Sequence, residues 1–130
     1  LPRLAIGDTA RVSLTSGFFT GAWASAGALL PEGRSQFATL PLGDVTLVVG
    51  GMYGGAPGNT AETLAASVVS DSLSAFAGPV GTNTIAGLGG GTLVGPVGAS
   101  WQDVDGSYHG IVVGGIDLVT RLRRDGAWGF

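Results

Sequence analysis

The stretch Val45-Thr-Leu-Val-Val-Gly-Gly51 decides the expected fold, because it returns later in the chain as His109-Gly-Ile-Val-Val-Gly-Gly115. Each copy contains a short apolar run that ends in two glycines, a pattern typical of a buried strand followed by a turn. Self-similarity at a spacing of some tens of residues indicates a repeat architecture.

Two further segments recur in the same order. Pro31–Ala38 is echoed by Pro79–Ala86, and Ser70–Phe76 is echoed by Arg124–Phe130. An upstream copy of the second segment lies at Ser16–Trp23. We infer a repeating unit of about 50 residues, with an insertion of roughly 16 residues near 87–106 in the last copy.

The rest of the chain favours strands over helices. Glycine or proline interrupts nearly every stretch long enough for a helix, and each glycine in a helix interior costs about 1 kcal/mol relative to alanine. Short apolar stretches bounded by Gly, Pro, Asp or Ser predict an all-β fold instead. The predicted strands are Ala10–Leu14, Gly21–Ala26, Gln36–Leu40, Val45–Val49, Thr63–Val69, Leu73–Ala77, Thr84–Leu88, Gly110–Val113 and Leu118–Arg123.

This order of features resembles the kelch repeat, whose copies form the four-stranded blades of a β-propeller. Leu30-Pro-Glu-Gly-Arg34 looks like the Leu-Pro-x-x-Arg opening of a kelch blade. Ser70–Phe76 is similar to the Asp-Gly-x-Leu-x-x-Trp closing turn of bacterial kelch repeats. The resemblance extends from about Thr9 to Phe130 and implies kelch-like blades of four antiparallel strands, in an incomplete ring for a single chain.

The sequence departs from the kelch pattern at two places. Thr82 stands in the later copy where Arg34 stands in the earlier one. Leu64 and Leu118 replace the tyrosine that the family carries after the paired glycines.

The resemblance implies a single kelch-like β domain over residues 1–130. Residues 9–26 would end a first blade, 27–77 form a second, and 78–130 form a third that contains the insertion. Propellers need roughly four to eight blades, so two to two and a half blades cannot close a ring. We expect that the chain is a segment of a longer propeller, that several copies assemble to close one, or that another protein completes an open stack of blades. Protein partners or further copies of the chain would then cover the flanks of the blades.

The composition agrees with hidden surface. Charged residues make up 12% of the 130 residues, about half the roughly 25% that is usual in a soluble domain. A net charge of −3 and the clustered arginines argue against a nucleic-acid partner. No apolar run is long enough for a membrane span, and the absence of cysteine excludes disulfides and thiolate metal sites.

We expect neither an enzyme nor a cofactor. His109 is the only histidine, and a catalytic site needs convergent groups, so a structural role at the start of a strand suits it better. A glycosidase would need two opposed carboxylates, and nothing in the sequence pairs Asp103 or Asp105 with another acid. No catalytic residue is therefore assigned.

The acids of Asp103-Val-Asp-Gly-Ser107 have the spacing of a truncated calcium loop. A β-turn with Asx hydrogen bonds explains the same residues equally well. The third acid and the distant glutamate of a calcium loop are missing, so no metal ligand is assigned, and the two interpretations stay open.

Four residues are candidates for ligand binding. Tyr53 and Trp101 are aromatics suited to contact a sugar or a peptide, although packing would explain them too. Arg121 and Arg123 fall on one face of a predicted strand, where they would hold an anion or a partner's carboxylates or guard the strand against edge pairing. Flanking aspartates, Asp117 among them, would neutralise these arginines.

The function that these observations favour is a non-enzymatic structural or recognition module of a larger assembly, extracellular or in a virion. It would work through β-propeller surfaces. The alternative is a carbohydrate-binding, lectin-like propeller that oligomerisation closes.

Overall fold

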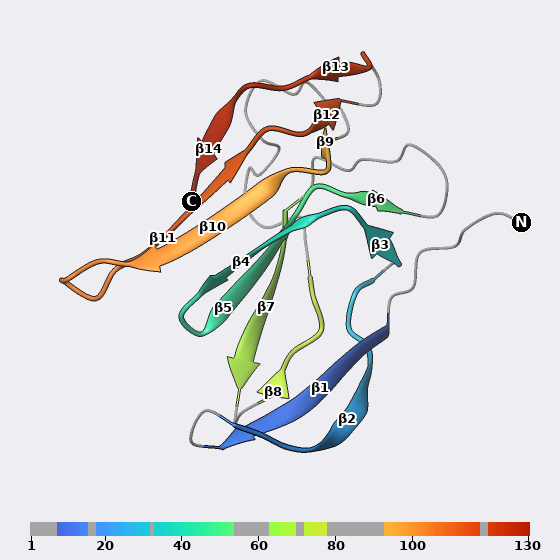
Figure 1. Ribbon diagram of the computed structural model, residues 1–130, viewed down its shortest axis with the longest axis vertical. Helices are drawn as coiled ribbons and strands as arrows, with labels where there is room; N and C mark the ends of the chain where they lie inside the picture. Colours follow the sequence, from blue (N-terminus) through green and yellow to red (C-terminus); the bar gives the residue numbers. More distant parts are fainter. Residues whose placement is uncertain are drawn as a thin grey trace, which may run out of the picture.

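The computed structural model describes residues 8–15, 18–31, 33–53, 63–69, 72–77, 93–117 and 120–130. Within these residues the regular structure consists of antiparallel β-strands, labelled in Figure 1. The prediction of an all-β fold is therefore confirmed. The predicted strand Thr84–Leu88 lies outside the described residues.

A four-stranded sheet, here called the first sheet, occupies the middle of the molecule (Figure 1). Its strands follow one another in space as they do in the sequence: β4 (Ala38–Leu42), β5 (Val45–Val49), β7 (Thr63–Val69) and β8 (Ser72–Leu73). The bounds of β5 and β7 are those that the apolar runs predicted.

A three-stranded sheet, here called the second sheet, contains β10 (Val97–Gln102), β11 (Tyr108–Val113) and β14 (Ala127–Gly129). Smaller pairings complete the fold. They join β1 to β2, β3 to β6, and β12 to both β9 and β13. Their bounds are Asp8–Thr15 for β1, Phe18–Ala28 for β2, Arg34–Ser35 for β3, Met52–Tyr53 for β6, Leu93–Val94 for β9, Ile116–Asp117 for β12 and Leu122–Arg123 for β13.

The two larger sheets repeat the same backbone. Ala38 pairs with Val49 in the first sheet, and Val97 pairs with Val113 in the second. A pair of glycines with positive φ follows each of these valines, at 68° and 97° in the first copy and at 67° and 104° in the second. Glycine adopts positive φ without the steric cost that other residues pay, which explains why this residue recurs at both turns.

The pairing extends to the short strands. Tyr53 and Asp117 each lie two residues after a pair of glycines. Tyr53 pairs with Arg34, and Asp117 pairs with Leu93. The register therefore matches 34–42 with 93–101. The repeat read from the sequence instead matches 31–38 with 79–86 and predicts an insertion near 87–106. Residues 79–86 lie outside the described residues. Within that segment, the structure has β9 and β10, which are counterparts of β3 and β4.

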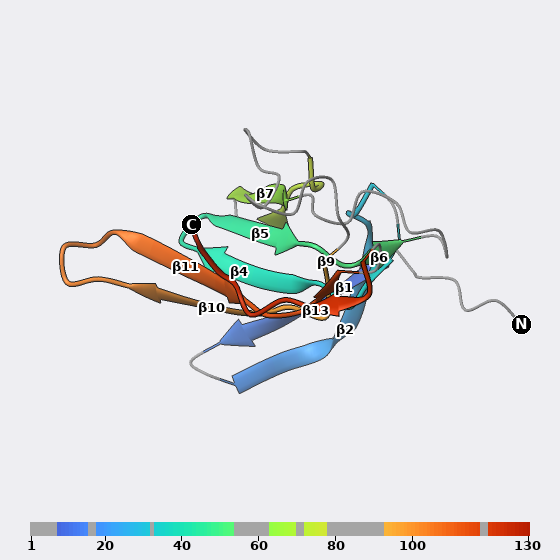
Figure 2. The ribbon, with the colours of Figure 1, turned by 90° about the horizontal axis from the view of Figure 1, so that it is seen from above.

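The two sheets pack face to face. On the second sheet the contact is made by the backbone of glycines, which have no side chain. Figure 2 shows the β10–β11 hairpin lying along β4. Leu40 is fully buried there, and a Cβ atom added to Gly98 or Gly110 would lie 2.9 or 3.0 Å from its methyl groups. Ala38, Val49 and the fully buried Val112 belong to the same core cluster as Leu40.

The opposite face of the first sheet is also covered. Val48, Leu64 and Ala66 point away from the second sheet and form another core cluster with Leu30 and Phe76. Adjacent residues of a strand face opposite sides, so Val48 and Val49 contribute to different clusters. The first sheet is thus covered on both faces at Val48 and Leu64, whereas Thr39 and Pro41 of β4 stay exposed on the side away from the second sheet.

Replacing Gly98 by valine is expected to destabilise the protein by about 1–3 kcal/mol, the usual cost of overpacking a core. The new side chain would have to displace Leu40 and would approach Ala38, 3.2 Å from the added Cβ. Urea unfolding followed by fluorescence measures the change. Gly129→Val is the matched control, because nothing lies within 4 Å of a Cβ there. Equal stabilities for the two variants would contradict the close packing.

Candidate functional site

The tip of the β10–β11 hairpin gathers the chemically distinctive side chains. Trp101 and His109 are cross-strand partners, so their side chains stand on the same face of the hairpin. Their rings are stacked, with centroids 5.6 Å apart and planes inclined by 22°. Trp101 nevertheless keeps 48% of its surface exposed, so the stack leaves much of the indole open to solvent.

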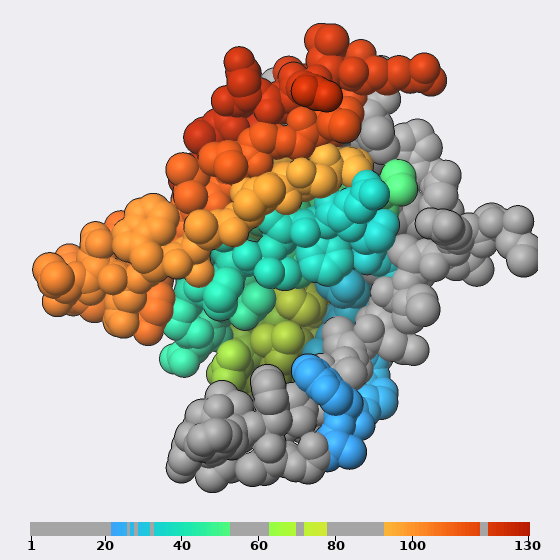
Figure 3. Space-filling model, viewed as in Figure 1, coloured from blue at the N-terminus to red at the C-terminus, as the bar shows by residue number. Residues whose placement is uncertain are grey.

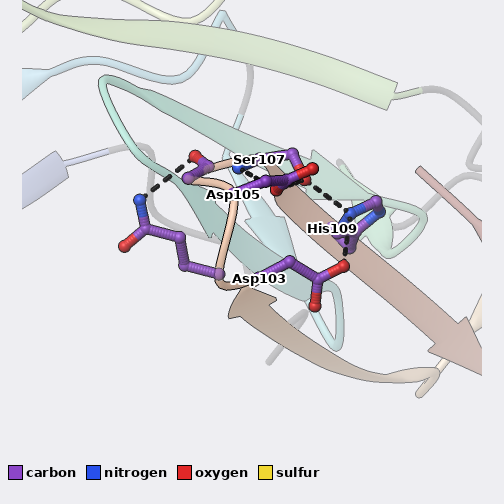
Figure 4. Close-up of polar contacts among 6 residues, drawn as sticks. Asp103, Asp105, Ser107 and His109 are labelled. Atoms are coloured by element: carbon purple, nitrogen blue, oxygen red, sulfur yellow. Dashed lines mark hydrogen bonds and ion pairs between the residues drawn. The ribbon is translucent and has the colours of Figure 1, made fainter.

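Polar groups surround the same imidazole (Figure 4). The Ser107 hydroxyl lies 3.1 Å from His109 Nε2, and an Asp103 carboxylate oxygen lies 3.2 Å from the same nitrogen. The Ser107 hydroxyl donates to Asp105 at 2.6 Å. In a nucleophilic triad, the serine and the carboxylate engage opposite nitrogens of the histidine ring, so this cluster does not have the geometry of a triad.

The tip is a turn held by its own hydrogen bonds. The Gly106 N–H donates to the Asp103 carbonyl at 3.0 Å, and the Ser107 N–H donates to the Asp105 carboxylate at 2.9 Å. The Asx hydrogen bond predicted for this segment is therefore confirmed. Within the described residues, no group of three or more His, Asp or Glu side chains is placed to hold a metal ion.

The hydrogen bonds of Ser107 also affect the charge of the tip. The side-chain hydrogen bond, followed by the backbone one, holds the pKa of the Asp105 carboxyl below its ordinary value. Both bonds favour the charged form of the acid, because an ionised carboxylate is the better acceptor. The tip therefore keeps this negative charge to a lower pH than an ordinary aspartate would.

The arginine cluster differs from the prediction of a single strand over Leu118–Arg123. Residues 120 and 121 form a turn, in which Arg121 has a φ of 57°, and within the described part of this range the strand is Leu122–Arg123. Leu118 and Val119 lie outside the described residues. Arg121 and Arg123 are both exposed, but they do not share a strand face as predicted.

The expected neutralisation of arginine charge by Asp117 occurs at Arg124, the residue after Arg123. Arg124 forms an ion pair with Asp117, whose side chain is almost completely buried. The Thr120 N–H also donates to the Asp117 carboxylate, at 3.3 Å. Burying a carboxylate is costly unless it is paired and hydrogen-bonded, and here both conditions are met. The pair therefore serves to hold this turn.

The two predicted aromatic residues belong to different sheets. Tyr53 lies in β6, where it pairs with Arg34, and Trp101 lies in β10. Of these two aromatic residues, Trp101 is the one that lies near the hairpin tip. Tyr108, which the sequence did not single out, lies on the opposite face of that hairpin and is 47% exposed. Its ring would be 2.8 Å from a Cβ added to Gly43.

Sequence reasoning also missed the role of Arg34. The residue was noted only as part of a motif, yet it is buried, and its guanidinium donates to the Gly50 carbonyl at 2.9 Å. The bond fixes the backbone at the first of the paired glycines. A buried position was not evident, because an arginine between glycine and serine is equally typical of an exposed loop.

No family model, curated protein or solved structure matches this chain. Among the described residues, no helix is long and apolar enough to cross a membrane.

Replacing Ser107 by alanine is expected to raise the pKa of Asp105 part of the way to its ordinary value. The hydroxyl bond is lost, while the backbone N–H bond remains. Because the folded-state pKa is lowered, Asp105 stabilises the fold above its ordinary pKa and loses this effect as the pH falls through the lowered value. NMR titration of the carboxyl carbon measures the shift. An unchanged pKa would contradict the role of Ser107, and the exposed Thr39→Ala change serves as control.

Proposed function

We propose that this chain is a non-enzymatic structural or recognition module of a larger extracellular or virion-type assembly, and that it binds other polypeptides through the faces of its β-sheets. The support comes from one side of the second sheet, here called the outer face. Besides His109 and Gly129, its members are apolar and alternate along the three strands: Val97, Ala99, Trp101, Ile111, Val113 and Ala127.

One comparison carries the proposal. In the first sheet, Ala38 and Val49 are 4% and 0% exposed, because the second sheet covers them. Their counterparts in the second sheet, Val97 and Val113, are 66% and 39% exposed. The same side of the same repeated unit is therefore core in one copy and surface in the other. In Figure 3 the atoms of β10 lie at the surface of the molecule.

Exposed apolar faces of this kind are typical of protein interaction sites. The kelch-like organisation belongs to the same proposal. A four-stranded antiparallel sheet in chain order and a pair of glycines after β5 and after β11 support it. The boundaries of the blades at 9–26, 27–77 and 78–130 remain predictions, and polypeptide outside these units would complete the ring.

The arrangement around His109 supports the non-enzymatic part of the proposal. Asp103 and Ser107 both approach the same ring nitrogen, and the Ser107 hydroxyl donates its hydrogen bond to Asp105. The serine proton is therefore directed to a carboxylate, where the imidazole cannot remove it as a general base. The cluster is better suited to hold the tip in one conformation.

The proposal is tested with a photo-reactive amino acid at Val97 in the protein expressed in the cells that naturally make it. Crosslinks from this position to polypeptide are expected, because the face is apolar and uncovered. The matched control is Val69 on β7, which is 63% exposed but lies on another sheet. Crosslinking no stronger at Val97 than at Val69 would overturn the proposal.

Carbohydrate binding is a second candidate, which one observation favours. The indole of Trp101 is half-exposed beside the polar groups of His109 and Asp103, and an apolar ring flanked by a few polar groups suits a sugar. On a glycan array, a bound sugar should be lost in Trp101→Ala and retained in Trp23→Ala, an exposed tryptophan on β2. Absence of any bound glycan would eliminate this candidate.

A further inference from the structure

The edge of β10 that faces away from β11 carries unpaired backbone groups. Ser100 lies opposite Gly110 of β11, but the N–H and C=O of Gly110 both bond with Phe130 on the other side, at 3.0 and 2.9 Å. Hydrogen-bonded pairs alternate along an antiparallel ladder, so the backbone groups of Ser100 and Gln102 point away from β11. Within the described residues, these groups have no hydrogen-bond partner.

This edge has none of the features that usually protect a sheet from pairing with another chain. Charged side chains, proline and β-bulges serve that purpose in natural proteins. β10 contains no charged residue and no proline, and its ladder with β11 has no register shift. In the first sheet, Pro41 occupies the position that Ser100 has in the second. Proline has no N–H to offer, so the equivalent edge of β4 is blocked while that of β10 is open.

The open part of the edge lies next to the hairpin tip. At the other end of β10, a Cβ added to Gly98 would be 3.2 Å from the Ala38 side chain, so β4 covers that end. The hairpin then extends past the edge of the first sheet, and its atoms project from the molecule in the space-filling view (Figure 1 and Figure 3). Residues 100–102 are therefore accessible to an added strand.

Trp101 provides the side-chain contact for such a strand. His109 stacks on its indole from the side of β11, and 48% of the surface of Trp101 stays exposed. Because Ser100 and Gln102 would form the hydrogen bonds, the residue opposite Trp101 would belong to a non-hydrogen-bonded pair, whose Cα atoms lie only about 4.5 Å apart. An aromatic side chain packs well against a β-branched one in a pair of this kind.

We propose that the edge of β10 at residues 100–102 binds an extended segment of another polypeptide. The segment adds a strand antiparallel to β10 and places a β-branched residue against Trp101. Peptides that extend a sheet in this way gain affinity from main-chain hydrogen bonds and specificity from alternate side chains. The inference goes beyond the proposed function, which concerns the faces of the sheets and not their edges.

NMR titration with a short peptide tests the proposal. The probe is Lys-Thr-Val-Thr-Val-Thr-Lys, blocked at both ends, in which every residue between the lysines is β-branched, so any register places such a residue opposite Trp101. On binding, the amide protons of Ser100 and Gln102 should exchange more slowly with solvent, because they become donors to the added strand. The indole resonances of Trp101 should shift in the same titration.

Ser100→Pro should raise the dissociation constant of the peptide about tenfold or more, because one donor is lost and the proline ring stands where the strand would lie. The N–H of Ser100 is not used by β11, and Pro41 occupies the equivalent position in the first sheet, so the fold should tolerate the change. Ser100→Ala is the matched control, because it keeps the N–H, and its dissociation constant should equal that of the wild type.

Trp101→Ala should also weaken binding, about two- to fivefold, through loss of the side-chain pair. Trp23→Ala, at an exposed tryptophan on β2, should leave the affinity unchanged. Circular dichroism establishes that all four variants are folded.

Three results would overturn the proposal. The first is a wild-type chain that does not bind the peptide at millimolar concentration, and the second is equal affinity of Ser100→Pro and Ser100→Ala. The third is protection of the Ser100 and Gln102 amides without peptide, together with a dimer in sedimentation equilibrium, which would show that a second copy occupies the edge. Crosslinking from Val97 in cells tests the outer face separately, so either proposal can fail while the other stands.

Discussion

The contact of Leu40 with the bare backbone of Gly98 and Gly110 is the interaction on which the rest of the fold depends. It brings β4 against the β10–β11 hairpin at a distance that no side chain on the hairpin would permit. Val112 is buried as a consequence, and alternation along β10 and β11 then turns Val97 and Val113 toward the outside. The core between the sheets and the exposed face of the second sheet thus have one physical cause.

The sequence predicted the strands wherever the apolar signal was dense. Val45–Val49 and Thr63–Val69 have the expected bounds, because β-branched and small apolar residues fill them without interruption. β10 was missed, because Gly98 and Ala99 weaken its alternation and the tight approach of Leu40, which requires a glycine, is invisible in a one-dimensional pattern. The repeat was recognised from its glycines, but its register could be established only from the strand pairing.

The candidate site was predictable in its local chemistry and not in its long-range partners. The hydrogen bond of Ser107 to Asp105 spans two residues, so a turn motif sufficed to predict it. The stacking of Trp101 on His109 and the ion pair of Asp117 with Arg124 depend on strand register and on a turn near Arg121. A residue such as arginine with a φ of 57° is uncommon, and propensity rules therefore favoured a continuous strand there.

The longer of the two equivalent hairpins gives this chain a place for variation. Gly43 and Asp44 alone connect β4 to β5, whereas residues 103–107 connect β10 to β11. The second hairpin also has one more pair of residues in its ladder. The added residues extend past the edge of the first sheet (Figure 1), and Val104 at the tip is completely exposed. Length and sequence at this tip can therefore diverge between related chains without disturbing the packed sheets, so a new binding specificity could evolve here independently of stability.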